Sequence, residues 1–99
     1  MSKATAGGAG AVASASGSAS HPDQIVVSIV ATPSQRIVGG WSIACSNGFQ
    51  AGSKSGQIAA ATPLIRTFTF GTTRPDRCTA HATAQLSRDG QLTVQIAHS

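Results

Sequence analysis

Apolar and polar residues alternate along most of the chain beyond position 24, which is the pattern of half-buried β-strands. In the first such stretch Ile25, Val27 and Ile29 share one face, and β-branched residues dominate it, as on a pleated, half-buried surface. The alternation predicts extended segments over residues 24–32, 36–46, 64–70, 78–86 and 92–97. No segment combines a 3.6-residue apolar stripe with helix caps at both ends. The chain is therefore predicted to be all-β and antiparallel.

Turn and break signals separate the predicted strands. Pro33 fixes φ and lacks an amide donor, so it ends the first strand and favours a hairpin with the second. Gly39-Gly40, in the middle of the second strand, predicts a β-bulge. Asp89-Gly90 is typical of a two-residue hairpin turn. The stretch from 47 to 63 is rich in Gly and Ser and is predicted to be a loop, with a short edge strand over 57–61.

The first twenty residues contain seven Ala, five Ser and four Gly. Such composition is typical of a flexible segment, so residues 1–20 are predicted to be a disordered linker or leader and residues 21–99 the folded domain. These twenty residues lack the apolar run of a signal peptide. The longest apolar stretch, 25–31, has seven residues, far short of the roughly 20 that span a bilayer as a helix.

Charged residues are scarce, with seven Lys and Arg, three Asp and no Glu, giving a net charge of +4. This charge permits attraction to an anionic polymer, although the basic residues are dispersed, as on a solvated surface. Trp41, Phe68 and Phe70 have core parity and Phe49 lies in the loop, so the stacking platform of a single-strand binder is missing. Specific nucleic-acid binding is not expected.

Residue clusters for catalysis, metals or cofactors are not found in the sequence, so no catalytic, metal or cofactor site is predicted. Cys78 and His81 are three apart on a strand, which places them on opposite faces. The three Asp residues fall at turns or strand starts, and the G-x-S-x-G elbow of a serine hydrolase is absent. A small hydrolase is the weakest alternative. Loops of sandwiches often carry recognition, and the candidate binding residues in loops are Asn47, Phe49, Lys54, Arg74 and Arg77.

Both cysteines, Cys45 and Cys78, fall on inward-facing stripes of predicted strands, 33 residues apart. They form either a disulfide, which implies an oxidising compartment, or two buried free thiols. In the chain-entropy model a bridge closing this loop stabilises the fold by roughly 3 to 4 kcal/mol.

The chain resembles the immunoglobulin-like β-sandwich superfamily, in the form of small secreted or cell-surface bacterial domains. The residues that carry the resemblance are Trp41-x-Ile43-x-Cys45, Cys78-x-Ala80-x-Ala82, the Asp89-Gly90 turn and Leu92-x-Val94-x-Ile96. The resemblance implies an Ig-like sandwich of six to seven short strands with one inter-sheet disulfide, Cys45–Cys78. The chain departs from antibody domains because Trp41 precedes the first cysteine and no Tyr is present, so their function does not carry over.

These observations predict a non-enzymatic, extracytoplasmic module for binding or structure, whose partner is another protein or an anionic polymer. The alternative is a virion or assembly component in which the uncharged strand 25–31 lies at a sheet edge and pairs with a neighbouring chain. The ligand and the oligomeric state are left open.

Overall fold

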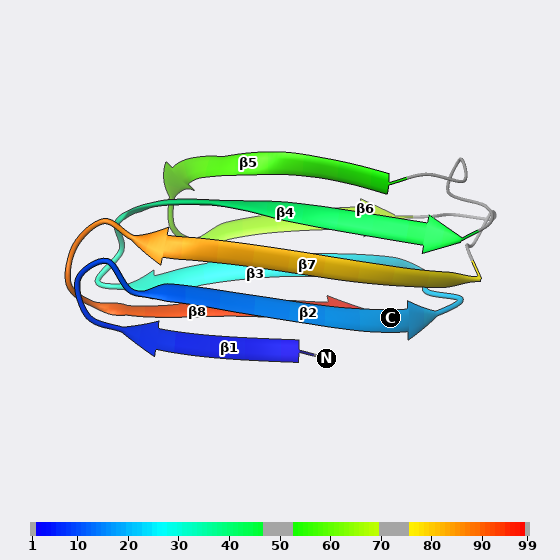
Figure 1. Ribbon diagram of the computed structural model, residues 1–99, viewed down its shortest axis with the longest axis horizontal. Helices are drawn as coiled ribbons and strands as arrows, with labels where there is room; N and C mark the ends of the chain where they lie inside the picture. The colour runs from blue at the N-terminus through cyan, green and yellow to red at the C-terminus, as the bar shows by residue number, and fades with distance from the viewer. Residues whose placement is uncertain (1, 47–52, 70–75, 99) are drawn as a thin grey trace.

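The computed structural model describes residues 2–46, 53–69 and 76–98, which form eight β-strands and no helix. Two four-stranded antiparallel sheets pack face to face, one in the order β1-β8-β3-β6 and the other in the order β2-β7-β4-β5 (Figure 1). The strands are β1 (Ser2–Gly7), β2 (Val12–Ser20), β3 (Gln24–Thr32), β4 (Arg36–Ser46), β5 (Ser53–Ala61), β6 (Leu64–Thr69), β7 (Arg77–Leu86) and β8 (Gln91–His98). The prediction of an all-β antiparallel sandwich is confirmed.

The strand pairing follows one simple rule. β1 pairs with β8, β2 with β7, β3 with β6 and β4 with β5, as in one long hairpin. Pairing of β3 with β8 and of β4 with β7 then rolls this hairpin into two sheets. This is the order of a jelly roll. The likeness to immunoglobulin domains thus holds at the level of two packed antiparallel sheets, whereas the connections differ from their ABED and CFG order.

Most predicted turns link the two sheets instead of pairing neighbouring strands. β3 and β4 belong to different sheets, as do β7 and β8, so the hairpins predicted at Pro33 and at Asp89-Gly90 are wrong. The predicted bulge at Gly39-Gly40 is also wrong, because the ladder between β4 and β7 runs through both glycines without a break. Local turn chemistry fixes where a strand ends, but the choice of partner strand depends on burial of the whole sheet.

The N-terminal twenty residues form strands β1 and β2, which corrects the expectation of a disordered linker. Alanine and serine alternate in β2, so that Ala13, Ala15 and Ala19 are buried while the serines between them are exposed. Small side chains suit these positions because β1 and β2 are edge strands that come close to each other across the sandwich. Judged by composition alone, such small residues cannot build a core. The alternation of alanine with serine nevertheless has the period of two that is typical of a β-strand.

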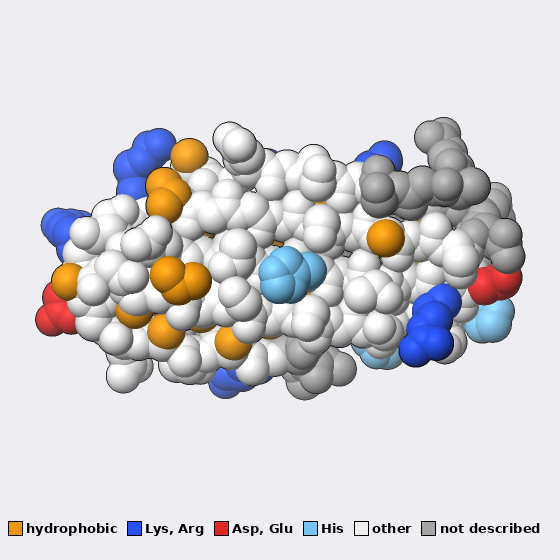
Figure 2. Space-filling model, viewed as in Figure 1, with side chains coloured by type: hydrophobic (Ala, Val, Ile, Leu, Met, Phe, Trp, Pro, Cys, Tyr) orange, Lys and Arg blue, Asp and Glu red, His pale blue; other side chains and the backbone are white. Residues whose placement is uncertain are grey.

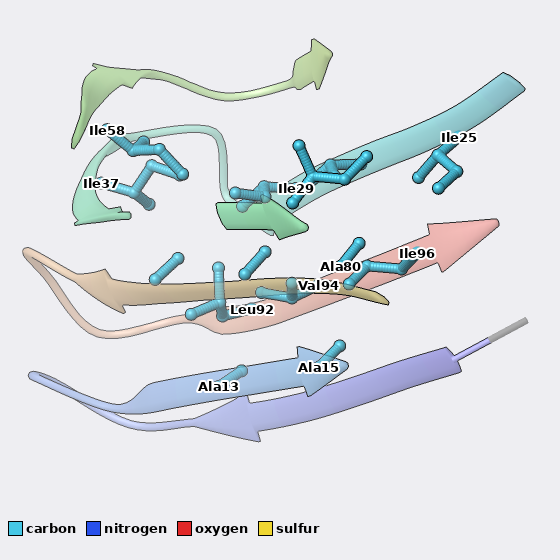
Figure 3. Close-up of a cluster of buried hydrophobic side chains, with 14 of the residues drawn as sticks. Ala13, Ala15, Ile25, Ile29, Ile37, Ile58, Ala80, Leu92, Val94 and Ile96 are labelled. Atoms are coloured by element: carbon cyan, nitrogen blue, oxygen red, sulfur yellow. The ribbon is translucent and has the colours of Figure 1, made fainter. Parts of the chain in front are cut away.

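The core lies between the two sheets and follows the predicted inward stripes (Figure 3). Ile29, Leu92 and Val94 contribute from the β1-β8-β3-β6 sheet, and Ile37 and Ile43 from the other sheet, each 1% exposed or less. Removing such side chains from water is the main favourable term in folding. The predicted inward parity of β3, β7 and β8 is confirmed.

Buried Gln35 ties three turns together at one end of the sandwich. Its side-chain carbonyl accepts a hydrogen bond from the Arg88 amide at 2.7 Å, and its Nε2 donates to the Asp89 carbonyl at 3.4 Å. The Thr62 hydroxyl accepts from the Gln35 amide at 3.1 Å, and the Thr62 amide donates to the Gln35 carbonyl at 3.0 Å. The two turns that enter β4 and β6 are therefore held against the turn that enters β8.

Strand β3 lies inside its sheet, paired with β6 on one side and β8 on the other. The expectation that 25–31 forms an exposed edge is therefore wrong, and with it the observation that motivated an assembly role. The edges of the two sheets are β1, β6, β2 and β5. Within the described ranges, the strands account for all regular structure, and no helix has the length and apolar character needed to cross a membrane.

Candidate functional site

The outer face of the β2-β7-β4-β5 sheet is broad and rich in hydroxyl groups. We call it the hydroxyl face. Its outward positions are Val12, Ser14, Ser16, Ser18 and Ser20 of β2, Arg77, Thr79, His81, Thr83 and Gln85 of β7, Arg36, Val38, Gly40, Ser42, Ala44 and Ser46 of β4, and Ser55, Gln57, Ala59 and Ala61 of β5. One row, formed by Val12, Gln85, Val38 and Ala59, is mainly apolar. Figure 2 shows that charged side chains gather at its ends and rims, whereas its centre is white apart from histidine and a few apolar side chains. Arg36 and Arg77 project from its two opposite ends.

Register aligns these side chains in rows across the four strands. Ser16 lies opposite His81, His81 opposite Ser42, and Ser42 opposite Ser55. Strands spaced about 4.8 Å apart and outward residues roughly 6.8 Å apart along each strand give the face a two-dimensional repeat. The repeat arises from strict alternation in the sequence, because each strand directs every second residue outward.

Hydrogen bonds between neighbouring strands orient part of this array. The Ser14 hydroxyl donates to the Thr83 hydroxyl at 2.8 Å, and the Thr83 hydroxyl donates to the Ala13 carbonyl at 3.3 Å. The hydroxyls of Ser18 and Thr79 share a hydrogen bond of 3.2 Å. A hydroxyl group has one proton but two acceptor lone pairs. The Ser14 and Thr83 hydroxyl protons are both donated to protein atoms, so the remaining lone pairs of these hydroxyl oxygens are available as acceptors.

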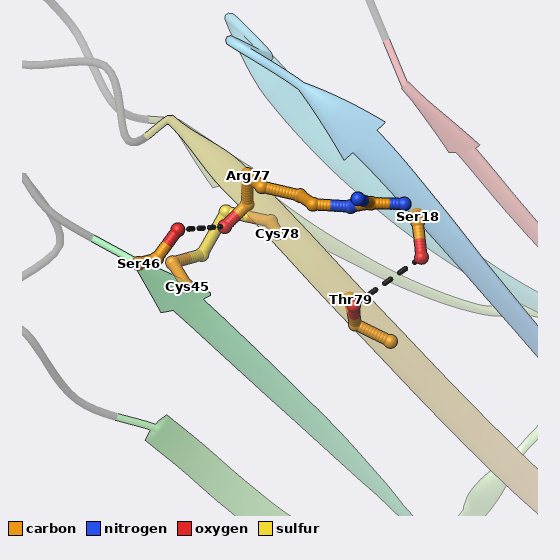
Figure 4. Close-up of a disulfide and its surroundings, with 6 residues drawn as sticks. All are labelled: Ser18, Cys45, Ser46, Arg77, Cys78 and Thr79. Atoms are coloured by element: carbon orange, nitrogen blue, oxygen red, sulfur yellow. Dashed lines mark hydrogen bonds between the residues drawn. A yellow bond between two sulfur atoms is a disulfide. The ribbon is translucent and has the colours of Figure 1, made fainter.

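An open, shallow depression of about 270 Å³ lies at one end of the face. It is lined by Ala44, Cys45, Ser46, Arg77 and Thr79. The Ser46 hydroxyl donates to the Arg77 carbonyl at 3.4 Å (Figure 4). In the same figure the Arg77 side chain extends over the sheet toward Ser18. A cation and several hydroxyl groups thus meet at this end.

The predicted disulfide between Cys45 and Cys78 is confirmed, and it lies beside this depression (Figure 4). Its predicted location between the two sheets is corrected, because the cysteines are directly paired on adjacent strands β4 and β7 of one sheet. Their Cα atoms are 4.1 Å apart. Cys78 is fully buried. The bridge fastens the two central strands of the sheet close to the end where both the 47–52 and 70–75 segments connect.

The sequence-predicted binding residues are only partly covered by the structure. Asn47, Phe49 and Arg74 lie outside the described residues. Lys54 is exposed on edge strand β5, opposite buried Ile43, so it belongs to the inward-facing row of that strand and not to the hydroxyl face. Arg77 is exposed and lines the depression. The face itself was missed, although the alternation of serine with alanine in the first twenty residues was the signal for it.

Trp41 belongs to the inward-facing row of β4 and is partly buried against the core. Its ring lies 4.9 Å from that of Phe68, at an interplanar angle of 51°. A Cβ added to Gly56 would lie only 2.7 Å from the indole Nε1, so Gly56 also lies against this ring. The predicted core parity of Trp41 and Phe68 is confirmed, and both are partly buried against the core.

Among the described residues, titratable side chains do not converge on the hydroxyl face. His81 is exposed and Cys78 is buried, which confirms that they lie on opposite sides of β7. His21 Nε2 and Asp76 Oδ1 are 3.6 Å apart, but both side chains are more than half exposed, so this pair contributes little. In the part of the chain that the structure describes, no three His, Cys, Asp or Glu side chains could hold a metal ion together.

Comparisons with known proteins support the fold assignment. The chain matches no family model and no curated protein sequence. The solved structure of TmCBM61 in complex with β-1,4-galactotriose has a TM-score of 0.54 and 7% identity over 97% of this chain and 70% of its own. CBM32 of AlyQ, in complex with 4,5-unsaturated mannuronic acid, has a TM-score of 0.40 and 12% identity, covering 98% of this chain and 76% of its own.

A neighbour from another functional class is the secreted serine protease VesC from Vibrio cholerae. It has a TM-score of 0.46 and 11% identity, over 92% of this chain and 19% of its own. At 7% identity, the likeness to TmCBM61 shows a shared β-sandwich fold and assigns no activity.

Proposed function

We propose that this protein is a non-enzymatic module that binds a polysaccharide through the hydroxyl face. The observation that carries the proposal is the face itself, with hydroxyl, amide and imidazole groups in register across four strands and charges confined to its ends. Each hydroxyl can both donate and accept, which matches the hydroxyl groups of sugars.

A binding role accounts for the chemistry better than catalysis does. Catalysis by general acid and base needs titratable groups close together around the reacting atoms. On the hydroxyl face, His81 has Ser16 and Ser42 as its lateral neighbours. These groups can hold a sugar ring by hydrogen bonds, directly or through water, but they do not form an acid–base pair.

The structure of TmCBM61 in complex with β-1,4-galactotriose supports a carbohydrate as the ligand class. We also propose that the module acts outside the cytoplasm. The Cys45–Cys78 disulfide supports this compartment, since such bonds persist where the environment is oxidising. The disulfide also links β4 and β7 covalently near one end of the sheet. It therefore resists local opening of the sheet, which suits a protein that works outside the cytoplasm.

Retention on a panel of polysaccharides, immobilised or insoluble, tests the proposal. We expect the wild-type protein to be retained on at least one neutral polysaccharide without releasing reducing sugars. His81→Asp places a charge in the centre of the face and should reduce retention. Thr67→Asp makes the same kind of change at an exposed position of β6, in the other sheet, and should not. Absence of retention on every polysaccharide, or equal effects of the two variants, would contradict the proposal.

A further inference from the structure

We infer that the ligand is the surface of an ordered, insoluble and uncharged polysaccharide, contacted by the whole hydroxyl face, and not a soluble oligosaccharide held in a pocket. This inference rests on the proposed function and adds the physical state and the charge of the ligand.

The first step is the size of the face compared with the strength of its contacts. A hydrogen bond between neutral groups contributes only about 0.5–1.5 kcal/mol net. Association itself costs an estimated 4–15 kcal/mol. An oligosaccharide that touches a few hydroxyls gains too little to offset that cost. Four strands of nine to eleven residues, with about 3.3 Å per residue and about 4.8 Å between strands, give the face roughly 30 × 19 Å. A face of that size approaches the roughly 800 Å² that one partner contributes to a stable interface.

The second step is the shape of the site. Compact ligand sites are clefts of about 300–1,000 Å³ that enclose most of the ligand. The depression beside the disulfide is smaller, at about 270 Å³, and it is open. It lies at one end, whereas the rows that run through His81 and Thr83 cross the middle of the sheet. A planar partner reaches all these rows together, whereas a ligand enclosed in this depression would reach only the end of the face.

The third step is the regular repeat of the hydroxyl groups. Ser14, Ser16 and Ser18 are spaced at every second residue of β2, and Thr79, His81 and Thr83 match them on β7. A disordered polymer meets such an array at few points. An ordered polymer surface repeats its own hydroxyl groups in two dimensions, so many weak contacts form simultaneously and add as in multivalent binding.

The fourth step is charge. The chain carries a net charge of +4, yet the central rows of the face contain no Lys, Arg, Asp or Glu among the described positions. A site for an acidic polymer would place cations along the path of the ligand, because complementary charge gives both attraction and specificity. Arg36 and Arg77 are at opposite ends of the face, five rows apart. The partner that fits the middle is uncharged.

The test measures depletion of the protein from solution by washed microcrystalline cellulose and crystalline chitin. The comparison ligands are swollen, disordered cellulose, polygalacturonate, and the soluble hexasaccharides of glucose, N-acetylglucosamine and galactose. We expect adsorption to at least one crystalline polymer, weaker adsorption to the disordered form, no competition by soluble hexasaccharides, and little dependence on NaCl concentration.

Two opposite charges at one central position separate an uncharged ligand from an acidic one. Ser42→Lys and Ser42→Glu should each weaken adsorption to the crystalline polymer by about tenfold or more, because either charge loses water without gaining a partner. Thr67→Lys and Thr67→Glu, exposed on β6 of the other sheet, are the matched controls and should adsorb like the wild type.

Several outcomes would overturn the inference. Hexasaccharides that bind as tightly as the crystalline polymer would place the ligand in a small site. Stronger adsorption of Ser42→Lys with weaker adsorption of Ser42→Glu, or polygalacturonate binding lost in Arg77→Gln, would identify an acidic ligand. Whether the result is a small site or an acidic ligand, polysaccharide binding, and with it the proposed function, would survive. Equal loss in the Thr67 controls would remove the face assignment, and no adsorption to any polysaccharide would refute the inference and the proposed function together.

Discussion

Two adjacent glycines in β4 provide a sharp test of the central strand pairing. An added Cβ at Gly39 would lie 2.0 Å from the Thr83 carbonyl oxygen and 2.9 Å from the Ala84 Cα, both backbone atoms of β7. An added Cβ at Gly40 has only the Gly56 carbonyl oxygen within reach, at 3.3 Å. Neither glycine has a positive φ. The two positions therefore differ in the space available and not in backbone strain.

The expected change in the free energy of unfolding follows from two opposing effects of the added methyl group. Overpacking a closely packed site costs typically 1–3 kcal/mol. Gly39→Ala belongs at the upper end of this range, because backbone atoms of a central strand must move. Replacing Gly by Ala also restricts the unfolded chain, which stabilises the protein by about 0.4–1 kcal/mol. We therefore expect a net loss of about 2 kcal/mol for Gly39→Ala. Gly40→Ala should stay within about 0.5 kcal/mol of the wild type.

Urea unfolding followed by the fluorescence of Trp41, the single Trp of the chain, measures this difference. With a urea m-value of about 1–2 kcal/mol/M, a loss of 2 kcal/mol lowers the midpoint by roughly 1–2 M. Gly40→Ala is the control for the general effect of alanine in this strand. If both variants unfolded at the same urea concentration, the close approach of β4 and β7 at Gly39 would be refuted.

Other expectations concern the bridge, the buried glutamine and the indole. Replacing both Cys45 and Cys78 by Ala should lower the free energy of unfolding, measured with urea, by about 3 to 4 kcal/mol, because the bridge closes a loop of 33 residues. The wild-type protein should show no free thiol when it is titrated without reductant. Gln35→Ala removes the side-chain hydrogen bonds that join the turns and should cost about 1–3 kcal/mol. By calorimetry this is a fall in Tm of at least about 4 °C, and an unchanged Tm would contradict the role given to Gln35. Saturating polysaccharide should leave the emission spectrum of Trp41 unchanged, since its side chain belongs to the inward-facing row of β4 and packs against the core, away from the hydroxyl face. A spectral shift would contradict binding at the hydroxyl face.

The face that each residue takes was predictable from the sequence, because alternation is a local property. The inward stripes of β3, β7 and β8 and the outward position of His81 all follow from a period of two. The partner of each strand was not predictable in this way. Turn signals at Pro33 and Asp89-Gly90 indicate only that the chain reverses, and a reversal can stay in one sheet or cross to the other. In this fold β4 and β5 are the consecutive strands that pair, and the other connections cross the sandwich.

The location of the disulfide likewise could not be predicted from local sequence patterns. Inward parity of Cys45 and Cys78 was sufficient to predict a bond. Parity does not distinguish an opposed sheet from a neighbouring strand, since both place the cysteines on the core side. The candidate site was missed for a related reason. The serines of β2 had been assigned to a linker by composition, and they gain a role only when the register places Ser16 beside His81.

The edges of the two sheets bear on how an uncharged face can remain available to a ligand. On one side of the sandwich, β1 and β2 lie close together and cover each other. On the other side, Lys54 of β5 lies opposite buried Ile43, and Arg66 of β6 lies opposite buried Val27, so both exposed cations belong to inward-facing rows of edge strands. Inward-pointing charges are a device by which edge strands resist the addition of another strand. Lys54 and Arg66 thus protect the β5 and β6 edges, which disfavours edge-to-edge assembly there and leaves the hydroxyl face open to a partner.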